Sequence, residues 1–375
     1  LLRLISRDPV RRQRFAQSAA SAIRTLGFDG LEIDWEYPDA GDGDGYVQLL
    51  QATRQAIGQA ELAIAAPAAP ARVDALGTEQ WRAIGQLVDH VNVMSYDYYG
   101  NWSDYSWFNA PMKIPADKQA ARDLDPSFCV TATLDKFLQL VAQNCLTRRQ
   151  LALGLAAYGR VVAVDGADDH NRGLICAINK KPVLAAGETS LDEPPLYRDI
   201  VAARAAGGYL PAKDEHSPSV GWPGLVFVDA LEGEARAPYA YRSSSQGRTG
   251  LSLTYDDPRS LREKVRYALA EQLGGVMVWD LSGDVAADQP ASLLAAVADE
   301  LRQSHPASQF RFTRQTPTGR WIDAAKLGEA LPPWPLKSQV QDYGAAPRRH
   351  QQILGGSAIA VMAALPAGAL ALSGP

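Results

Sequence analysis

The chain has 375 residues, of which 46% are apolar and 21% charged, a composition typical of a globular protein with one large domain or two. Its net charge of −5 and isoelectric point near 5.6 argue against a nucleic-acid-binding protein. Three cysteines are too few for a disulfide scaffold. A disulfide between Cys129 and Cys145 is left as an alternative, and at least one thiol stays free or pairs with another chain.

The first predicted element is a helix over residues 8–27. Asp8 can cap this helix, Pro9 suits its first turn, and Gly27 suits the position past its end. The chain starts Leu-Leu-Arg, without an initiator Met or a signal segment. We therefore expect either a mature, processed chain or a fragment.

Strand-like segments and helices alternate along the rest of the chain. A strand in the run 28–38 comes first, and each later apolar segment follows a predicted helix: 62–67 after 45–60, 91–97 after 79–87, 151–158 after 132–144, and 274–280 after 258–272. Glu36, Ala66 and Tyr96 are spaced by 30 residues, close to the roughly 31 residues per unit of a (β/α)₈ barrel. This pattern predicts a parallel α/β barrel.

The run 28–38 carries three carboxylates at every second position, Glu32, Asp34 and Glu36. Alternate side chains of a strand share one face, so these acids lie side by side while Leu31, Ile33 and Trp35 take the other face. Neighbouring carboxylates push their pKa values apart. A glycosidase uses that arrangement, because it needs one carboxylic acid protonated beside another that is ionised.

The run resembles the signature of glycoside hydrolase family 18, the chitinases, which reads Asp-Gly-x-Asp-x-Asp-Trp-Glu-Tyr-Pro; the one departure is Glu32, where the family usually has Asp. The resemblance implies a TIM (β/α)₈ barrel with this run as strand four. The chain then holds strands four to eight, and strands one to three are missing. Residues 162–243 match an α+β insertion domain between strands seven and eight. The expected divisions are barrel 1–161, insertion 162–243, barrel 244–305, extension 306–349 and an apolar tail 350–375.

The resemblance also implies a role for each site residue in a retaining, substrate-assisted mechanism. Glu36 is the general acid and then the base, Asp34 orients the 2-acetamido group of the sugar, and Glu32 holds Asp34. The longer Glu32 puts the rate and the pH optimum in question. Tyr96 holds the acetamido carbonyl. The expected substrate contacts are Met94, Asp97, Trp102, Tyr158, Arg160 and Trp279. Trp107 is as well explained by ordinary packing.

The expected partner is chitin or a chito-oligosaccharide, bound by a secreted monomer without a cofactor or a metal. The segment 39–45 resembles a calcium loop but lacks its ligand spacing, and it is interpreted as a flexible turn. No contact with nucleic acid is expected, and none with a membrane except through the tail 350–375, which has no charged side chain.

Two other functions stay open. A chitinase-like lectin has the same fold, but such proteins typically lose the acid at the position of Glu36. A related hydrolase would act on N-glycan cores or peptidoglycan. The long insertion favours chitin, because a deep groove suits a long polymer, whereas endo and exo action are not distinguished.

Overall fold

The computed structural model describes residues 1–118, 124–182, 191, 193–208, 221–228, 230–245 and 248–304, together with the backbone of 361–364. In chain order the helices and strands are α1 Leu2–Arg7, α2 Pro9–Leu26, β1 Gly30–Ile33, η1 Ala40–Asp42, α3 Gly43–Ile57, β2 Glu61–Ala66, α4 Pro70–Val73, α5 Thr78–Leu87, β3 His90–Val93, α7 Val130–Ala142, η2 Arg148–Gln150, β4 Leu151–Ala156, β5 Arg160–Val164, α8 Tyr197–Ala205, β6 Val226–Val228, β7 Tyr239–Arg242, β8 Gly250–Thr254, α9 Pro258–Ala270, β9 Gly275–Trp279, η3 Leu281–Gly283, α10 Leu293–Ser304 and β10 Val361–Ala364.

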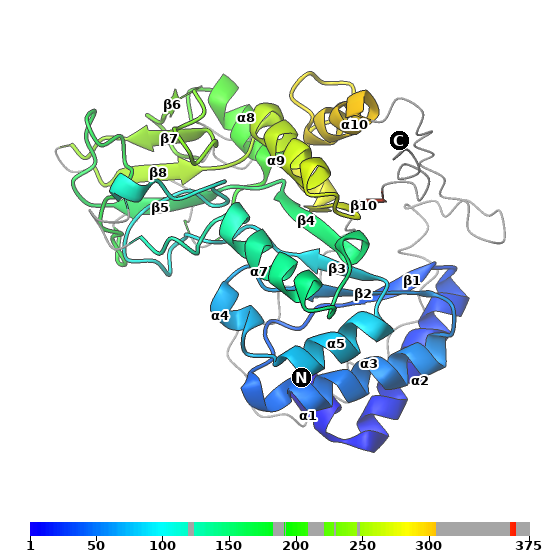
Figure 1. Cartoon of the computed structure of the whole chain (residues 1–375). Helices are drawn as coiled ribbons and strands as arrows, with labels where there is room; N and C mark the ends of the chain where they lie inside the picture. Colours follow the sequence, from blue (N-terminus) through cyan, green and yellow to red (C-terminus); the bar gives the residue numbers. More distant parts are fainter. Residues whose placement is uncertain are drawn as a thin grey trace, which may run out of the picture.

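The main sheet contains the five predicted strands. Its order is β1-β2-β3-β4-β9-β10, and the neighbours from β1 to β9 are parallel whereas β10 is antiparallel to β9. Helices separate these parallel strands in the sequence, which confirms the α/β alternation (Figure 1). Within the described residues β1 pairs with β2 alone, so the sheet is not seen to close.

Local chemistry explains why the first long helix forms where the sequence predicts it. The Asp8 side chain accepts hydrogen bonds from the backbone N–H groups of Val10 (2.8 Å) and Arg11 (3.1 Å). Pro9 occupies the first turn, and Gly27 ends the helix in the left-handed conformation at φ 71°. A capping side chain and a left-handed glycine satisfy the free backbone groups at the two ends of a helix.

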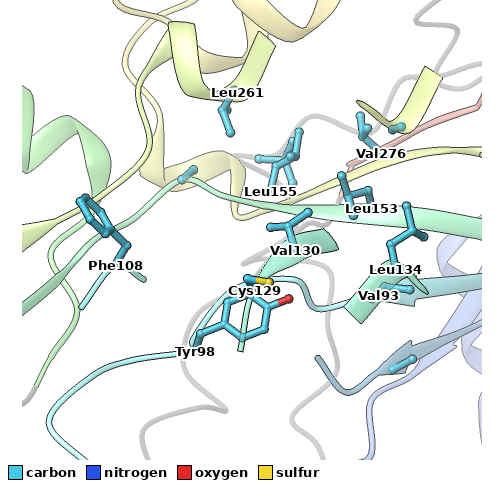
Figure 2. Packing of buried hydrophobic residues seen from close by; sticks show 14 of the residues in the cluster. Val93, Tyr98, Phe108, Cys129, Val130, Leu134, Leu153, Leu155, Leu261 and Val276 are labelled. Atoms are coloured by element: carbon cyan, nitrogen blue, oxygen red, sulfur yellow. The ribbon is translucent and has the colours of Figure 1, made fainter. Parts of the chain in front are cut away.

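The largest hydrophobic core lies on the helix-covered face of the main sheet. Leu153 and Leu155 of β4 belong to it together with Val130 and Leu134 of α7 and Leu261 of α9 (Figure 2). All five side chains are fully buried. The opposite face of the main sheet is left for polar and aromatic side chains, which form the site described below.

A second sheet forms between β4 and β9 in the sequence. It is antiparallel, with the order β5-β8-β7-β6, and lies beside the main sheet in Figure 1. Its strands run from Arg160 to Thr254, so they extend past both ends of the expected insertion 162–243. The division of the chain at those two positions stays a prediction.

The possible Cys129–Cys145 disulfide is wrong, because both of these thiols are free and buried. Cys129 precedes α7 and Cys145 follows it. A helix of this length extends about 20 Å, whereas the Cα atoms of a disulfide lie within about 7 Å of each other.

The interpretation of segment 39–45 as a flexible turn is also wrong. It forms η1 and the start of α3, and the buried Asp42 side chain accepts a hydrogen bond from the Asp39 backbone N–H (2.9 Å). The same carboxylate forms ion pairs with Arg3 (2.7 Å) and Arg7 (3.0 Å) of α1. These contacts attach the segment after the acidic run to the first helix.

The predicted extension 306–349 lies outside the described residues, and so does the tail 350–375 except for the backbone of β10. Within the described part of the chain, no helix is both long and apolar enough to cross a membrane.

Candidate active site

The acidic run stands at the carboxyl end of β1. The strand ends at Ile33, so Glu32 lies inside it, and Asp34 and Glu36 follow just beyond. The sequence expectation of one continuous strand is wrong in this detail, but the alternation persists. Glu32 is half-buried, whereas Asp34 and Glu36 keep a larger exposed fraction and are partly covered by the surrounding protein. Trp35 is buried on the helix side, with its ring 5.2 Å from that of Tyr46 in α3.

The three carboxyl groups of the row are linked by charge. Burial raises the pKa of Glu32, and a hydrogen bond from the Asn92 side chain opposes that rise. Burial and then the charge of Glu32 raise the pKa of Asp34. Burial and then the charge of Asp34 raise the pKa of Glu36, whereas a hydrogen bond with Tyr37 lowers it. The surrounding protein therefore favours a retained proton at Glu36, as a general acid requires.

Apolar and aromatic side chains line the same face of the main sheet beside the acids. Met94, Tyr96 and Tyr158 are buried in one cluster, against which Tyr37 and Trp279 pack. The Tyr96 and Tyr158 rings meet edge to face at 5.9 Å. Four expected site residues are thus brought together: Met94, Tyr96, Tyr158 and Trp279.

A glycine in β4 makes room for the Tyr96 ring. A Cβ atom on Gly154 would lie 2.9 Å from Cε1 of Tyr96, closer than real side chains approach. The Ser95 hydroxyl donates to the Gly154 carbonyl oxygen (2.8 Å), which fixes the chain just past the end of β3. Neighbouring strands therefore determine the position of Tyr96.

Asp97 joins three other expected residues into one network. Its carboxylate accepts hydrogen bonds from the Tyr158 hydroxyl and from Nε of Arg160, both at 2.8 Å. The Arg160 guanidinium lies 4.8 Å from the centre of the Trp102 ring. The exposed fraction of Trp102 is 51%, so this ring is open to a ligand. Asp97 itself has φ 61°, and its backbone N–H donates to Asn109 Oδ1 (3.1 Å).

Sequence reasoning gave no role to Tyr37, Asn92 or Asn109. Tyr37 was visible only as the residue after Glu36, and Asn92 only as a residue on the face of Met94 and Tyr96. The Asn92 contact connects positions 60 residues apart, so no local pattern signals it. Trp107 is buried with its ring 5.1 Å from that of Phe108, in agreement with packing rather than sugar contact.

The peptide bonds Glu36–Tyr37 and Trp279–Asp280, both at this site, are cis. The described residues contain no group of three or more His, Cys, Asp or Glu side chains arranged to hold a metal ion. Carboxylates, tyrosine hydroxyls and the Arg160 guanidinium supply polar groups on this face, with aromatic rings around them. Such a set can transfer a proton and pack against the apolar side of a sugar.

The chain is 25% identical over 311 residues to a sporulation-specific chitinase 2 of Saccharomyces cerevisiae, covering 80% of this chain and 55% of that protein. It is 26% identical over 318 residues to chitinase B of Serratia marcescens, with coverages of 78% and 61%. Among solved structures, chitinase ChiA74 from Bacillus thuringiensis superposes with a TM-score of 0.62 at 27% identity, over 81% of this chain and 48% of that chain.

This chain spans little more than half the length of these two chitinases. Its fold is of the α/β TIM-barrel type found in its structural neighbours. The family model for glycosyl hydrolases family 18 matches residues 3–284. That stretch includes the acidic run, the aromatic cluster and the Asp97 network, and the chain belongs to glycosyl hydrolases family 18.

Proposed function

We propose that the protein is a chitinase that hydrolyses β-1,4 bonds of N-acetylglucosamine polymers, with Glu36 as general acid and base. The observation that carries this proposal is the arrangement on one face of the main sheet. Three charge-coupled carboxyl groups stand at the carboxyl end of β1, beside Tyr96, Tyr158 and Trp279. Active sites of (β/α)₈ barrels lie at this end of their strands.

The proposed reaction is substrate-assisted and retains configuration, as in the exceptions to the two-carboxylate scheme. The 2-acetamido carbonyl oxygen attacks its own anomeric carbon while Glu36 protonates the leaving glycosidic oxygen. Asp34 orients the acetamido N–H and stabilises the positive charge on the ring that forms. Tyr96 donates its hydroxyl to the acetamido oxygen. Glu36 then takes a proton from the water that opens the ring.

The remaining contacts would bind the sugar chain. Trp279 forms an apolar surface under the sugar whose bond is cleaved. Arg160, Asp97 and Met94 contact the sugars near the bond, and Trp102 offers its exposed ring to a neighbouring sugar. The Tyr158 ring and the Arg160 guanidinium hold this group together, with 5.4 Å between them.

We infer that the five parallel strands correspond to strands four to eight of the barrel. On this interpretation strands one to three are not in the chain, and residues 162–243 form the insertion domain between strands seven and eight. The low coverage of the relatives supports it, because the unmatched parts of those proteins have room for the strands. We also propose a secreted monomer, since chitin is an extracellular polymer too large to enter a cell.

Hydrolysis of a fluorogenic chitobiose or chitotriose glycoside tests this function. Glu36→Gln should lower kcat by about 10²- to 10⁴-fold, the usual contribution of a general acid. Glu61→Gln is the matched control, because Glu61 is an exposed acid at the opposite end of the same sheet. Its activity should equal that of the unaltered chain.

If the unaltered chain shows no hydrolysis, the assay is repeated with strands one to three of a family member fused to its N-terminus. Release that then depends on Glu36 supports the hydrolase. Chitin binding without release in the completed barrel would contradict hydrolysis and indicate a chitin-binding lectin.

A further inference from the structure

Glu32, the one departure from the family signature, has a partner two strands away. Its carboxylate accepts a hydrogen bond from Nδ2 of Asn92 in β3. Strand β2 lies between them, where Glu32 is in register with Ala63 and Asn92 with Ala65. Two strand spacings separate the β1 and β3 backbones by about 10 Å.

Small side chains on β2 make this contact possible. Ala63 and Ala65 extend no further than Cβ, so the Glu32 and Asn92 side chains meet above them. An Asp at position 32 would be shorter by one carbon–carbon bond, about 1.5 Å. The extra methylene of Glu32 is therefore matched to the distance that its carboxylate must span.

The partner amide is fixed in one orientation. Asn92 is 3% exposed, and within the described residues its Oδ1 atom has no hydrogen-bond partner. A rotated amide would place that oxygen against the Glu32 carboxylate, where two acceptors repel each other. An amide N–H donated to a carboxylate favours the ionised form of the acid.

We propose that Asn92 is a positioning residue that holds Glu32 ionised and directed across β2, so that its negative charge is presented to Asp34. The family signature has Asp at this position, shorter by one carbon–carbon bond, so the contact as it stands belongs to the Glu of this chain. The consequence for catalysis rests on the proposed function, in which Asp34 and Glu36 share the proton that Glu32 does not carry.

Few other groups face Glu32 among the described residues. The charge of Glu32 interacts with three titratable groups: Asp34 of the same segment, Tyr96 after β3 and Tyr46 of α3. The neighbouring positions on β2 are alanines, and Ala152 of β4 is in register with Asn92. Asn92 is therefore the side chain whose hydrogen bond opposes the effect of burial on Glu32 and favours its ionised form.

Thermal unfolding against pH tests the proposal without substrate. Burial raises the pKa of Glu32 in the folded protein, so folded stability falls as pH rises through its titration. Asn92→Ala removes the opposing hydrogen bond and raises that pKa further. The melting temperature of Asn92→Ala should lie only slightly below that of the unaltered chain near pH ~4. This difference should grow toward pH ~7 and stay constant above the raised pKa of Glu32.

Comparing Asn92→Ala in the unaltered chain and in Glu32→Gln separates this effect from lost packing. In Glu32→Gln no charge remains, so adding Asn92→Ala should lower the melting temperature equally at every pH. Val91→Ala truncates the fully buried neighbour in β3, and its deficit should also be independent of pH. A constant deficit for Asn92→Ala in both backgrounds would overturn the proposal.

Glu32→Asp provides a second route if Asn92→Ala does not fold. The shorter acid should lose the bond, so its carboxyl ¹³C titration midpoint should not change when Asn92→Ser is added. The same addition to the unaltered chain should raise the Glu32 midpoint, and an unchanged midpoint there would contradict the proposal. Failure of the chain to hydrolyse chitobiose would count against the proposed function and leave these titrations decisive for Asn92.

Discussion

At the scale of single residues, Tyr37 opposes the other influences on Glu36, the proposed general acid. Its hydroxyl hydrogen-bonds to the Glu36 carboxyl and lowers the pKa of that group, against burial and the charge of Asp34, which raise it. The Tyr37 ring packs against the aromatic cluster, and the Arg72 guanidinium lies 5.8 Å from its centre. The ring and the hydroxyl can be separated by mutation.

Tyr37→Phe keeps the ring and removes the hydrogen bond. The pKa of Glu36 should rise, because its ionised form loses a donor. Glu36 then stays protonated to higher pH, and the alkaline limb of the pH profile of kcat/KM should move upward. Tyr46→Phe is the control, since the Tyr46 hydroxyl has no partner among the described residues. A downward shift for Tyr37→Phe, or an equal shift for both variants, would contradict this role.

The sequence predicted which side chains gather at the site better than how they are held there. Met94, Tyr96, Asp97, Tyr158 and Arg160 meet as expected. The reason is that the first four follow the carboxyl ends of the parallel strands β3 and β4, where strand ends converge. Arg160 begins β5 of the second sheet, two residues after Tyr158. Their supporting contacts depend on the lateral distance between strands, which no sequence spacing encodes.

At the scale of elements, strand ends were predicted less well than strand identity. The strands β1 and β3 end at Ile33 and Val93, before Glu36 and Tyr96 and not after them. Side chains alternate in the same way along a paired strand and along an extended segment beyond it. The pattern therefore continues where the backbone hydrogen bonds stop.

The segment after the acidic run was misinterpreted for a different reason. Its order comes from Arg3 and Arg7, more than 30 residues earlier in the chain. Burial alone would raise the pKa of Asp42, but hydrogen bonds from the Asp39 backbone and from Arg3 outweigh it, and the pKa is lowered. The ionised Asp42 thus stabilises the fold.

Asp42→Asn should lower the free energy of unfolding at neutral pH by about 1–3 kcal/mol, the cost of disrupting a buried hydrogen-bonded group. A lowered folded-state pKa gives stability that is present above the unfolded-state pKa and is lost as pH falls through the folded one. The difference from the unaltered chain, measured by urea unfolding, should therefore shrink below pH ~4.

Asp39→Asn is the matched control for this prediction. Asp39 also binds Arg3, but 58% of its side chain is exposed, so it should contribute about 0–1 kcal/mol. Equal losses for the two variants, or a loss at Asp42 that does not change with pH, would contradict the stabilising role of the Asp42 charge.

At the scale of the whole molecule, the two sheets share one hydrophobic core. The largest cluster contains Leu153 of the main sheet and Leu251 and Leu253 of the second sheet. Phe108 links the parts, with its ring 5.7 Å from that of Tyr239 in β7. The sequence predicted the main sheet because helices separate its strands at regular intervals. The strands β6, β7 and β8 of the second sheet follow one another without a helix between them in the described residues, so that alternation does not mark them.

The three buried thiols have a practical consequence for following how the molecule opens. Cys129 and Cys145 flank α7 under the main sheet, and Cys176 packs in a separate small cluster with Val164 and Ile178. A buried thiol cannot meet a bulky reagent until the structure around it opens. The labelling rate of each cysteine therefore reports how often its own part of the protein opens.

Labelling with a chromogenic disulfide reagent should be slow in native buffer and complete in denaturant. Variants that retain one cysteine at a time should show whether Cys176 reacts at the same rate as Cys129 and Cys145. Equal rates are expected if the shared core makes the two sheets open together. A Cys176 that reacts much faster would mean that the second sheet opens alone.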